Sequence, residues 1–160
     1  MHKPVALITG ASTGIGYEMA KIFAARGYDL VVVARSAKNL KALQNSLSPL
    51  VKVTSIPLDL ASPRAAQSLF SKTQKAKLEI DVLVNNAGFG SSGKFVDLDL
   101  KRELMQIDLN VRVLTELTHL YGAEMSKRKK GRILNVASTA AFQPGPFMAV
   151  YYATKAFVLH

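Results

Sequence analysis

The sequence contains no cysteine and no tryptophan. Without cysteine there is no disulfide framework, thiolate zinc site or cysteine nucleophile, and this absence fits a reducing compartment. Long apolar runs are missing too, since the stretch Leu30–Ala34 is strand-sized and far below the ~18 residues of a membrane-spanning helix. The N-terminus leads straight into Val5–Ile8, which is too short for the apolar region of a signal peptide. We therefore expect a cytoplasmic protein without a membrane span.

Acidic residues are few, and the resulting charge limits the class of partner. Lys and Arg number 21 against 11 Asp and Glu, a formal net charge of +10. Such a balance raises nucleic acid, a membrane surface or a phosphorylated ligand as partners. The basic run Lys127–Lys130 has no aromatic residues between its charges, as single-strand binding requires, and cations there suit the end of a helix. We expect no nucleic-acid partner.

Short β-branched runs alternate with longer stretches of helical period, a pattern typical of βα units around a parallel sheet. The predicted strands are nearly all apolar, as expected of strands covered on both faces. They are approximately Val5–Thr9, Leu30–Ala34, Val51–Ile56, Val82–Asn85 and Arg132–Val136. No repeat or linker interrupts the 160 residues. The sequence therefore predicts one domain over residues 1–160, an α/β fold with a doubly wound, Rossmann-like parallel sheet.

Apolar periodicity predicts the helices between these strands. The first is indicated by residues at i, i+4, i+7 and i+8, which are Ile15, Met19, Ile22 and Phe23, and Gly27 follows as its C-terminal glycine. A second helix begins at Ser36. A third is expected to open at Ser62–Pro63, where an N-cap residue precedes a proline.

The longest helix is expected from about Asp99 to Arg128, and a last one begins near Ala149. The apolar residues that indicate the long helix form one stripe: Leu104, Ile107, Val111, Leu114 and Tyr121.

The first predicted strand ends in a glycine-rich turn, Thr9–Gly16, that leads directly into a helix. Unpaired backbone N–H groups at the positive end of a helix bind phosphate. Gly10 suits the tight turn, Gly14 lets the backbone approach a pyrophosphate, and Gly16 permits close packing of helix and strand. The spacing G-x-x-x-G-x-G departs from the G-x-G-x-x-G fingerprint. The turn alone thus leaves dinucleotide binding, another phosphate site and an ordinary connection open.

Arg35, after the second predicted strand, indicates which dinucleotide would bind. It stands about 20 residues past the glycines, where an acidic residue would hold the ribose of NAD and an arginine would accept the 2′-phosphate of NADP. A cation at a helix start opposes the helix dipole, which disfavours a purely solvated role. We expect NADP in preference to NAD.

Tyr151 and Lys155 stand four residues apart, so on a helix they lie one turn apart on the same face. An ammonium group in that place favours the charged form of a phenol and suits it to acid–base chemistry. Tyr152 would need its partner at Ala156 and is set aside. Because such pairs also occur by chance in many helices, the rest of the sequence has to decide.

Over its whole length the sequence resembles the classical short-chain dehydrogenase/reductase family. The family's cofactor turn T-G-x-x-x-G-x-G matches Thr9–Gly16, and its N-N-A-G segment matches Asn85–Gly88. Asp59-Leu60 matches the family's adenine-contacting aspartate, although Asp59 is also suited to a simple turn before Ser62. The family's catalytic tetrad matches Asn110, Ser138, Tyr151 and Lys155.

The resemblance implies hydride transfer between a nicotinamide cofactor and a carbonyl or alcohol. Tyr151 would donate a proton to the carbonyl oxygen, and Ser138 would hydrogen-bond the same oxygen. Lys155 would hold the nicotinamide ribose, and Asn110 a water that links Lys155 to solvent. No metal is expected. The expected cofactor contacts are Gly10, Ser12, Thr13, Gly14, Ile15, Gly16, Arg35, Asp59, Leu60, Asn86, Ala87, Gly88, Tyr151 and Lys155.

The segment between Ser138 and Tyr151 is poor in charge and rich in apolar residues. If Phe142, Phe147 and Met148 line the pocket together with Phe89, the substrate is a small apolar carbonyl or alcohol. The alternative is that they only pack the loop.

Members of the family continue past the tyrosine–lysine helix through two more strands and a segment that covers the substrate. The sequence stops at His160, inside that helix, so we expect a C-terminally truncated reductase with an open edge at the fifth strand. Negligible turnover is expected of these 160 residues alone. The alternative function is a non-catalytic, NADP-binding or partner-binding fragment, and a homo-oligomer is expected for a complete chain.

Overall fold

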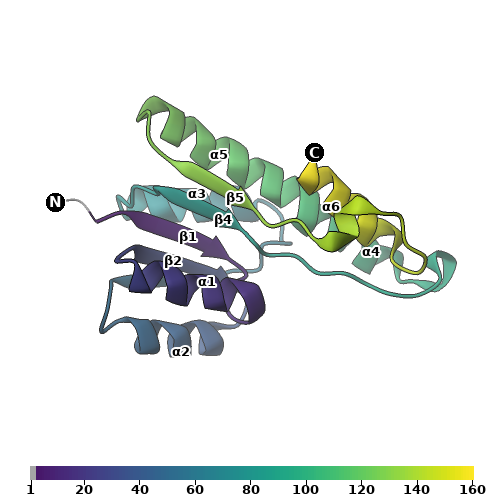
Figure 1. Cartoon of the computed structure of the whole chain (residues 1–160), viewed down its shortest axis with the longest axis horizontal. Coiled ribbons are helices and arrows are strands. Elements are labelled where there is room, and N and C mark those ends of the chain that lie inside the picture. The colour runs from purple at the N-terminus through teal and green to yellow at the C-terminus, as the bar shows by residue number, and fades with distance from the viewer. Residues whose placement is uncertain (1–2) are drawn as a thin grey trace.

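Five parallel strands form one sheet in the computed structural model, which describes residues 3–160 (Figure 1). The strands are β1 (Val5–Thr9), β2 (Asp29–Ala34), β3 (Val53–Pro57), β4 (Val82–Asn85) and β5 (Arg132–Asn135). Their order is β3-β2-β1-β4-β5, so the direction of winding reverses between β1 and β4. In such sheets the point of reversal leaves a crevice at the carboxyl ends of the strands. All five predicted strands are confirmed, with β3 shifted toward Pro57.

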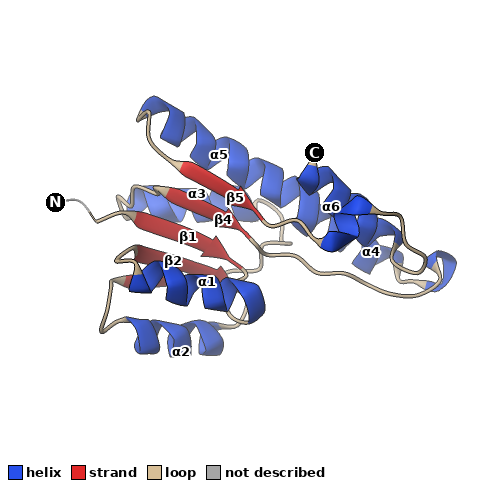
Figure 2. Ribbon diagram, viewed as in Figure 1, coloured by secondary structure: helices blue, strands red, loops and turns tan. Residues whose placement is uncertain are grey.

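Helices cover both faces of the sheet, which confirms the Rossmann-like α/β prediction (Figure 2). They are α1 (Gly14–Ala25), α2 (Ala37–Leu47), α3 (Ala65–Lys75), α4 (Leu100–Ile107), α5 (Leu114–Lys127) and α6 (Ala149–Leu159). Alternate residues of β1 enter two separate cores: Ala6 and Ile8 pack with residues of α1 and α2, and Leu7 with residues of α3 and α5. Helices α4 and α6 lie beyond the carboxyl ends of the strands (Figure 1).

The buried face of α1 is not the apolar stripe that predicts the helix. Ile15 and Ile22 are 62% and 50% exposed, whereas the fully buried positions are Gly16, Ala20 and Ala24. Small residues let the helix axis approach the sheet, and a Cβ on Gly16 would lie 2.5 Å from the carbonyl oxygen of Gly10. The pattern thus predicts the helix correctly, while only Met19 and Phe23 of its stripe pack against the core.

Helix α3 begins later than the sequence indicates. Ser62 does not cap it, because its hydroxyl donates to the carbonyl oxygen of Asp59 at 2.6 Å. The chain then passes through Arg64, whose φ of 59° is left-handed, before the helix starts at Ala65. The expected N-cap at Ser62, with Pro63 as the first helical residue, is therefore wrong.

The long helix predicted over residues 99–128 is divided by a π-helical section, Asp108–Val113, between α4 and α5. Asp99 caps its start by accepting from the N–H of Lys101 at 3.0 Å. A π turn holds an extra residue and so rotates the buried face of the helix beyond it. The apolar stripe is accordingly buried in α5, at Leu114 and Tyr121, but exposed in α4, at Leu104 and Ile107.

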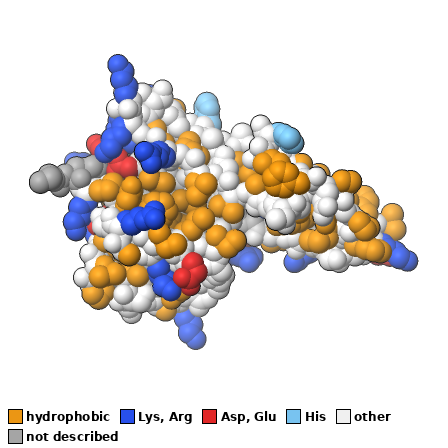
Figure 3. Space-filling view, viewed as in Figure 1, with side chains coloured by type: hydrophobic (Ala, Val, Ile, Leu, Met, Phe, Trp, Pro, Cys, Tyr) orange, Lys and Arg blue, Asp and Glu red, His pale blue; other side chains and the backbone are white. Residues whose placement is uncertain are grey.

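The basic run after α5 makes local contacts. Lys127 pairs with Glu124 and Lys130 with Asp81, both at 2.8 Å, and Arg128 donates to the carbonyl oxygen of Ile80 at 2.7 Å. On the face shown in Figure 3, the basic side chains are scattered among apolar and neutral ones. None of the helices formed by residues 3–160 has the length and apolar character that crossing a bilayer requires.

Candidate active site

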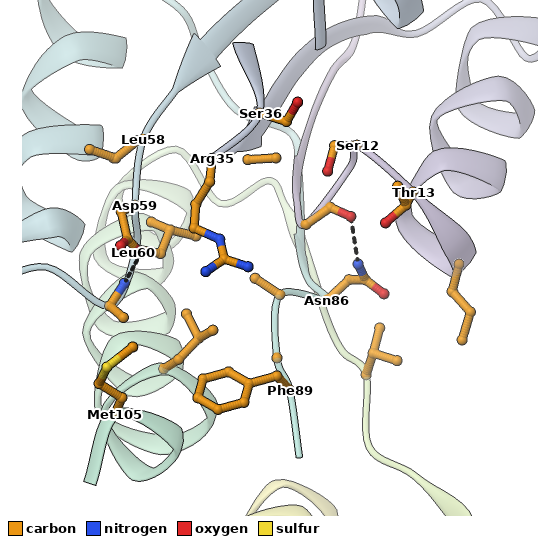
Figure 4. A pocket seen from close by; sticks show the side chains of 18 of the residues that line it. Ser12, Thr13, Arg35, Ser36, Leu58, Asp59, Leu60, Asn86, Phe89 and Met105 are labelled. Carbon is orange, nitrogen blue, oxygen red and sulfur yellow. Dashed lines mark hydrogen bonds between the residues drawn. The ribbon is translucent and has the colours of Figure 1, made fainter. Parts of the chain in front are cut away.

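A groove of about 650 Å³ lies at the carboxyl edge of the sheet and receives residues that follow each of the five strands (Figure 4). Twelve of the predicted site residues line it: Gly10, Ser12, Thr13, Ile15, Arg35, Asp59, Leu60, Asn86, Ala87, Gly88, Tyr151 and Lys155. Gly14, Gly16, Asn110 and Ser138 do not line it. The sequence analysis did not single out other lining residues, including Ser36, Leu58, Met105 and Leu109.

Hydrogen bonds from the Asn86 side chain hold the glycine turn in place. The Asn86 amide nitrogen donates to the carbonyl oxygens of Thr9 at 2.9 Å and Gly10 at 3.3 Å. Gly10 has a φ of 67°, and a Cβ there would meet the Asn86 amide at 2.9 Å. Gly14 has a φ of 58°, and among the described residues nothing lies within 4 Å of its Cβ position. The turn is therefore packed on its inner side and open at Gly14.

The first turn of α1 is available to an anion. Its N-cap residue, Thr13, makes no side-chain hydrogen bond to the helix within the described residues. The N–H groups of a first turn have no intrahelical partner and stand at the positive end of the dipole. Phosphate is the ligand that this arrangement suits best.

Thr9 joins the ends of β1 and β4, a role that the sequence analysis did not assign to it. Its hydroxyl donates to the carbonyl oxygen of Val84 at 3.2 Å and accepts from the N–H groups of Asn86 and Ala87, both at 3.0 Å. The side chain is 1% exposed. It thereby fixes the segment Asn86–Gly88 beside the glycine turn.

Arg35 is exposed, and its guanidinium extends into the groove (Figure 4). Within residues 3–160 no carboxylate forms an ion pair with it. Asp59 also lines the groove, while its carboxylate accepts from the N–H of Ala61 at 3.0 Å and its carbonyl oxygen accepts from Ser62. Asp59 thus shapes a turn and faces the groove at the same time.

Helix α6 brings Tyr151 and Lys155 to the same wall of the groove, as their spacing predicts. Lys155 is 7% exposed, and its ammonium donates to the carbonyl oxygen of Val136 at 2.8 Å. Burial lowers the pKa of Lys155, because the charged form loses water. A Cβ on Gly88 would lie 3.6 Å from the Lys155 Nζ, so the N-A-G segment runs directly past the ammonium.

Asn110, in the π-helical section, is 1% exposed. Its Oδ1 accepts from the N–H of Phe89 at 3.2 Å, and its Nδ2 donates to the carbonyl oxygen of Phe89 at 2.9 Å and to Thr154 Oγ1 at 3.1 Å. Asn110 therefore fixes the segment after β4 to α6. Its expected role in holding a water stays a prediction.

Ser138 precedes a short 3₁₀ turn and accepts from the N–H of Ala140 at 3.1 Å. Its own hydroxyl proton remains available for donation. Phe142 and Phe147 are 75% and 57% exposed and lie outside the groove lining, whereas Phe89 lines it. The apolar part of the groove lining includes Phe89, Met105 and Leu109.

The sheet, the glycine turn and the groove define a Rossmann-like α/β protein. A family model described as short chain dehydrogenase matches residues 4–160, and the chain belongs to that family. Within residues 3–160 no group of three His, Asp or Glu residues could hold a metal ion.

Relatives of the chain are named reductases and dehydrogenases. The very-long-chain 3-oxoacyl-CoA reductase of Pyrenophora tritici-repentis is 33% identical over 159 residues, which are 96% of this chain and 47% of the relative. Sulfoacetaldehyde reductase 2 of Chromohalobacter salexigens is 35% identical over 96% of this chain and 62% of its own. The chain thus spans about half the length of the first of these relatives.

Solved structures share the fold closely. A ketone-specific alcohol dehydrogenase from Comamonas testosteroni has a TM-score of 0.92 and 37% identity, covering 99% of this chain and 64% of that one. A short-chain dehydrogenase from Sphingobium yanoikuyae in complex with NADPH has a TM-score of 0.91 and 39% identity, covering 98% and 61%.

Proposed function

We propose that the protein is an NADP-dependent oxidoreductase that transfers a hydride between the nicotinamide and an apolar carbonyl or alcohol. One observation carries the proposal: Tyr151 and Lys155 share one groove with the glycine turn and Arg35. These residues lie far apart in the sequence and serve different chemical tasks. Acid–base groups beside a phosphate-binding helix start are what a nicotinamide-dependent reductase needs.

The groove fits a phosphorylated dinucleotide in three respects. Its volume of about 650 Å³ lies within the usual range for ligand sites. The uncapped start of α1 suits a pyrophosphate, and the unpaired guanidinium of Arg35 suits a 2′-phosphate. Asp59 and Leu60 would then border the adenine, and Gly88 and Lys155 the nicotinamide ribose.

The cofactor would supply the hydride, and the chain's own residues would handle the proton. Tyr151 donates its phenolic proton to the carbonyl oxygen as negative charge develops there. Ser138, which lies outside the groove lining, would donate a hydrogen bond to the same oxygen, since its hydroxyl accepts from the N–H of Ala140 and keeps its own proton for donation. Lys155, anchored by the carbonyl oxygen of Val136, lies one helical turn from Tyr151, where its positive charge would favour the phenolate.

The substrate class is supported by the groove lining near Tyr151. Phe89 lines the groove and is the neighbour of Gly90, whose Cβ position lies 2.9 Å from the Tyr151 ring, so an apolar substituent on the carbonyl suits that place better than a charged one. The names of two relatives agree with this class, since one is a very-long-chain 3-oxoacyl-CoA reductase and the other is specific for bulky ketones.

Because the chain spans about half the length of the first relative, the proposal is tested in a protein of the relatives' full length that carries these residues, by Tyr151→Phe with Tyr152→Phe as the matched control. Removing the proton donor should lower the reduction of an aryl alkyl ketone by about 100-fold or more, while the Kd for NADPH stays within twofold. Turnover is followed by the absorbance of NADPH. Because the chain has no tryptophan, the emission of NADPH itself reports binding without interference.

A normal rate in Tyr151→Phe together with a lost rate in Tyr152→Phe would refute the assignment of the proton donor. If the unmodified protein bound NADPH and turned over no carbonyl substrate, it would be a cofactor-binding protein without this activity.

A further inference from the structure

Three polar side chains are buried together between α4 and the segment after β4. Ser91 is 9% exposed, Glu103 4% and Gln106 0%. The Ser91 hydroxyl donates to Glu103 Oε1, the Gln106 amide donates to Glu103 Oε2 at 3.4 Å, and the N–H of Ser91 donates to Gln106 Oε1 at 3.1 Å. The hydrogen bonds form a closed ring, which we call the Ser91 ring.

Glu103 is a buried acidic side chain without a basic partner among the described residues. Within residues 3–160 no lysine or arginine forms an ion pair with it. Its position in the first turn of α4 favours a negative charge, and its two oxygens each accept a hydrogen bond. Apolar side chains of similar size would fill this space without the cost of burying a charge. The hydrogen bonds of the Ser91 ring fix the position of Ser91 relative to α4.

The segment that the ring fixes passes directly under the proposed proton donor. A methyl group on Gly90 would lie 2.9 Å from Tyr151 Cδ2 and 3.2 Å from Met148 Cε, so the Gly90 backbone is in contact with the phenol ring. Asn110 holds Phe89 on one side of Gly90, through both its N–H and its carbonyl oxygen. The Ser91 ring holds the other side.

We propose that Glu103 and Gln106 are positioning residues, which fix Ser91 to α4 so that Gly90 forms a rigid seat for the ring of Tyr151. Neither side chain lines the groove or reaches the reacting atoms. They act on the phenol through the backbone of Gly90. The inference rests on the proposed function, in which Tyr151 donates the proton.

The test places 3-fluorotyrosine at position 151 of the full chain and records its ¹⁹F resonance, which needs no turnover. Glu103→Leu and Gln106→Leu should shift or broaden that resonance. Glu103→Gln should retain it, because an amide oxygen still accepts from the Ser91 hydroxyl. Gly90→Ala should displace the ring directly, through the 2.9 Å contact, and so reproduce the effect of Glu103→Leu.

Ketone reduction supplies a second measurement on the same variants. Glu103→Leu should lower kcat by about 10- to 100-fold, since a displacement of about 1 Å costs that much, with the KM for NADPH within twofold. Glu103→Gln should restore most of kcat. The matched control is Thr73→Val, which removes a buried hydroxyl between α3 and α5 and should change neither the resonance nor kcat.

An unchanged resonance in both Glu103→Leu and Gly90→Ala would refute the proposal that the Ser91 ring positions Tyr151 through Gly90, whatever the activity of the protein. A changed resonance in Thr73→Val would also overturn it, because the effect would then be general destabilisation. Absent turnover, or an active Tyr151→Phe variant, would instead refute the proposed function. The ¹⁹F measurement would still decide whether Glu103 and Gln106 position the Tyr151 ring.

Discussion

Arg35 and Lys155 are the two cations among the described residues that line the groove, and they are held very differently. Lys155 is buried and bonded to the carbonyl oxygen of Val136, whereas Arg35 is exposed. An unpaired guanidinium in a groove keeps its hydrogen-bonding capacity for a ligand, and its planar fork matches a phosphate. In the proposed function, the choice between the two dinucleotides is therefore decided at residue 35.

Arg35→Asp should reverse the cofactor preference. The variant loses the charge-assisted hydrogen bonds to the 2′-phosphate and places a carboxylate of like charge there, so its affinity for NADPH should fall by about 100-fold. The same carboxylate offers NADH an acceptor for its ribose hydroxyls. Titration of the emission of each reduced cofactor measures both effects. Arg26→Asp, at the far end of α1, makes the same charge change outside the groove and should leave the preference as it is. Equal affinities of the unmodified protein for both cofactors would contradict the role of Arg35.

Among single residues, those whose task depends on the local chain are the ones that sequence predicts well. The positive φ angles of Gly10 and Gly14 and the shared face of Tyr151 and Lys155 follow from turn chemistry and helix geometry. The contacts of Asn110 and Asn86 do not, because their partners stand 21 and 77 residues away in the sequence. Only the folded chain shows which backbone groups they hold.

The contact between α1 and the glycine turn leaves no room for a side chain. Gly16→Ala places a methyl group 2.5 Å from the carbonyl oxygen of Gly10, and overpacking of this kind costs about 1–3 kcal/mol. The same variant should also have a higher Kd for NADPH, because the added methyl group displaces the start of α1. Gly122→Ala, whose Cβ would meet Ile133 at an ordinary 3.5 Å, should instead raise stability slightly. Urea unfolding of the two variants checks the contrast, and equal stabilities would contradict it.

Helices α3 and α5 are joined by a hydrogen bond between Thr73 Oγ1 and the Tyr121 hydroxyl at 2.9 Å. Burial raises the pKa of Tyr121 from 10.0 to about 12, since the phenolate would lose its water. The unfolded chain therefore releases this proton at lower pH than the folded one. Stability from this group is complete below pH 10 and is lost as the pH rises toward about 12.

Tyr121→Phe should remove the part of the stability loss at high pH that this phenol causes. The variant should have a lower free energy of unfolding than the unmodified protein at pH 8. Between pH 8 and pH 11.5 the difference should shift in favour of the variant by about 2 kcal/mol. Denaturant unfolding at the two pH values gives the difference. Tyr28→Phe, a tyrosine outside the α3–α5 contact, serves as the control. Parallel pH profiles of the unmodified protein and Tyr121→Phe would show that the buried phenol is not responsible.

At the level of elements, the alternation of strands and helices follows from the sequence, but the most deeply buried positions of α1 do not. Periodicity records where apolar residues recur, and it cannot show that α1 presents Gly16, Ala20 and Ala24 to the sheet because small residues allow close approach. Nor does it reveal the extra residue of the π-helical section that turns Asn110 inward. Both features depend on contacts with distant strands.

The groove as a whole is assembled from segments after all five strands, so a ligand that spans it should stabilise the entire fold. NADPH at 100 times its Kd should add about 2.7 kcal/mol to the free energy of unfolding by mass action. Thermal unfolding with and without NADPH measures the gain, and Arg35→Asp should abolish most of it. An unfolding temperature that does not respond to saturating NADPH would mean that the folded chain does not bind the cofactor.

The central position of β1 has a consequence for the order in which the chain folds. β1 can pair with β2 early, yet its other neighbour, β4, and the Asn86 amide that supports the glycine turn arrive only 77 residues after Thr9. Closing so long a loop is entropically costly, and parallel pairings at such separations form slowly. During synthesis the glycine turn therefore leaves the ribosome long before it has its support. If it binds the cofactor as proposed, it becomes competent only when β4 has docked, and cofactor binding is then a late event in folding.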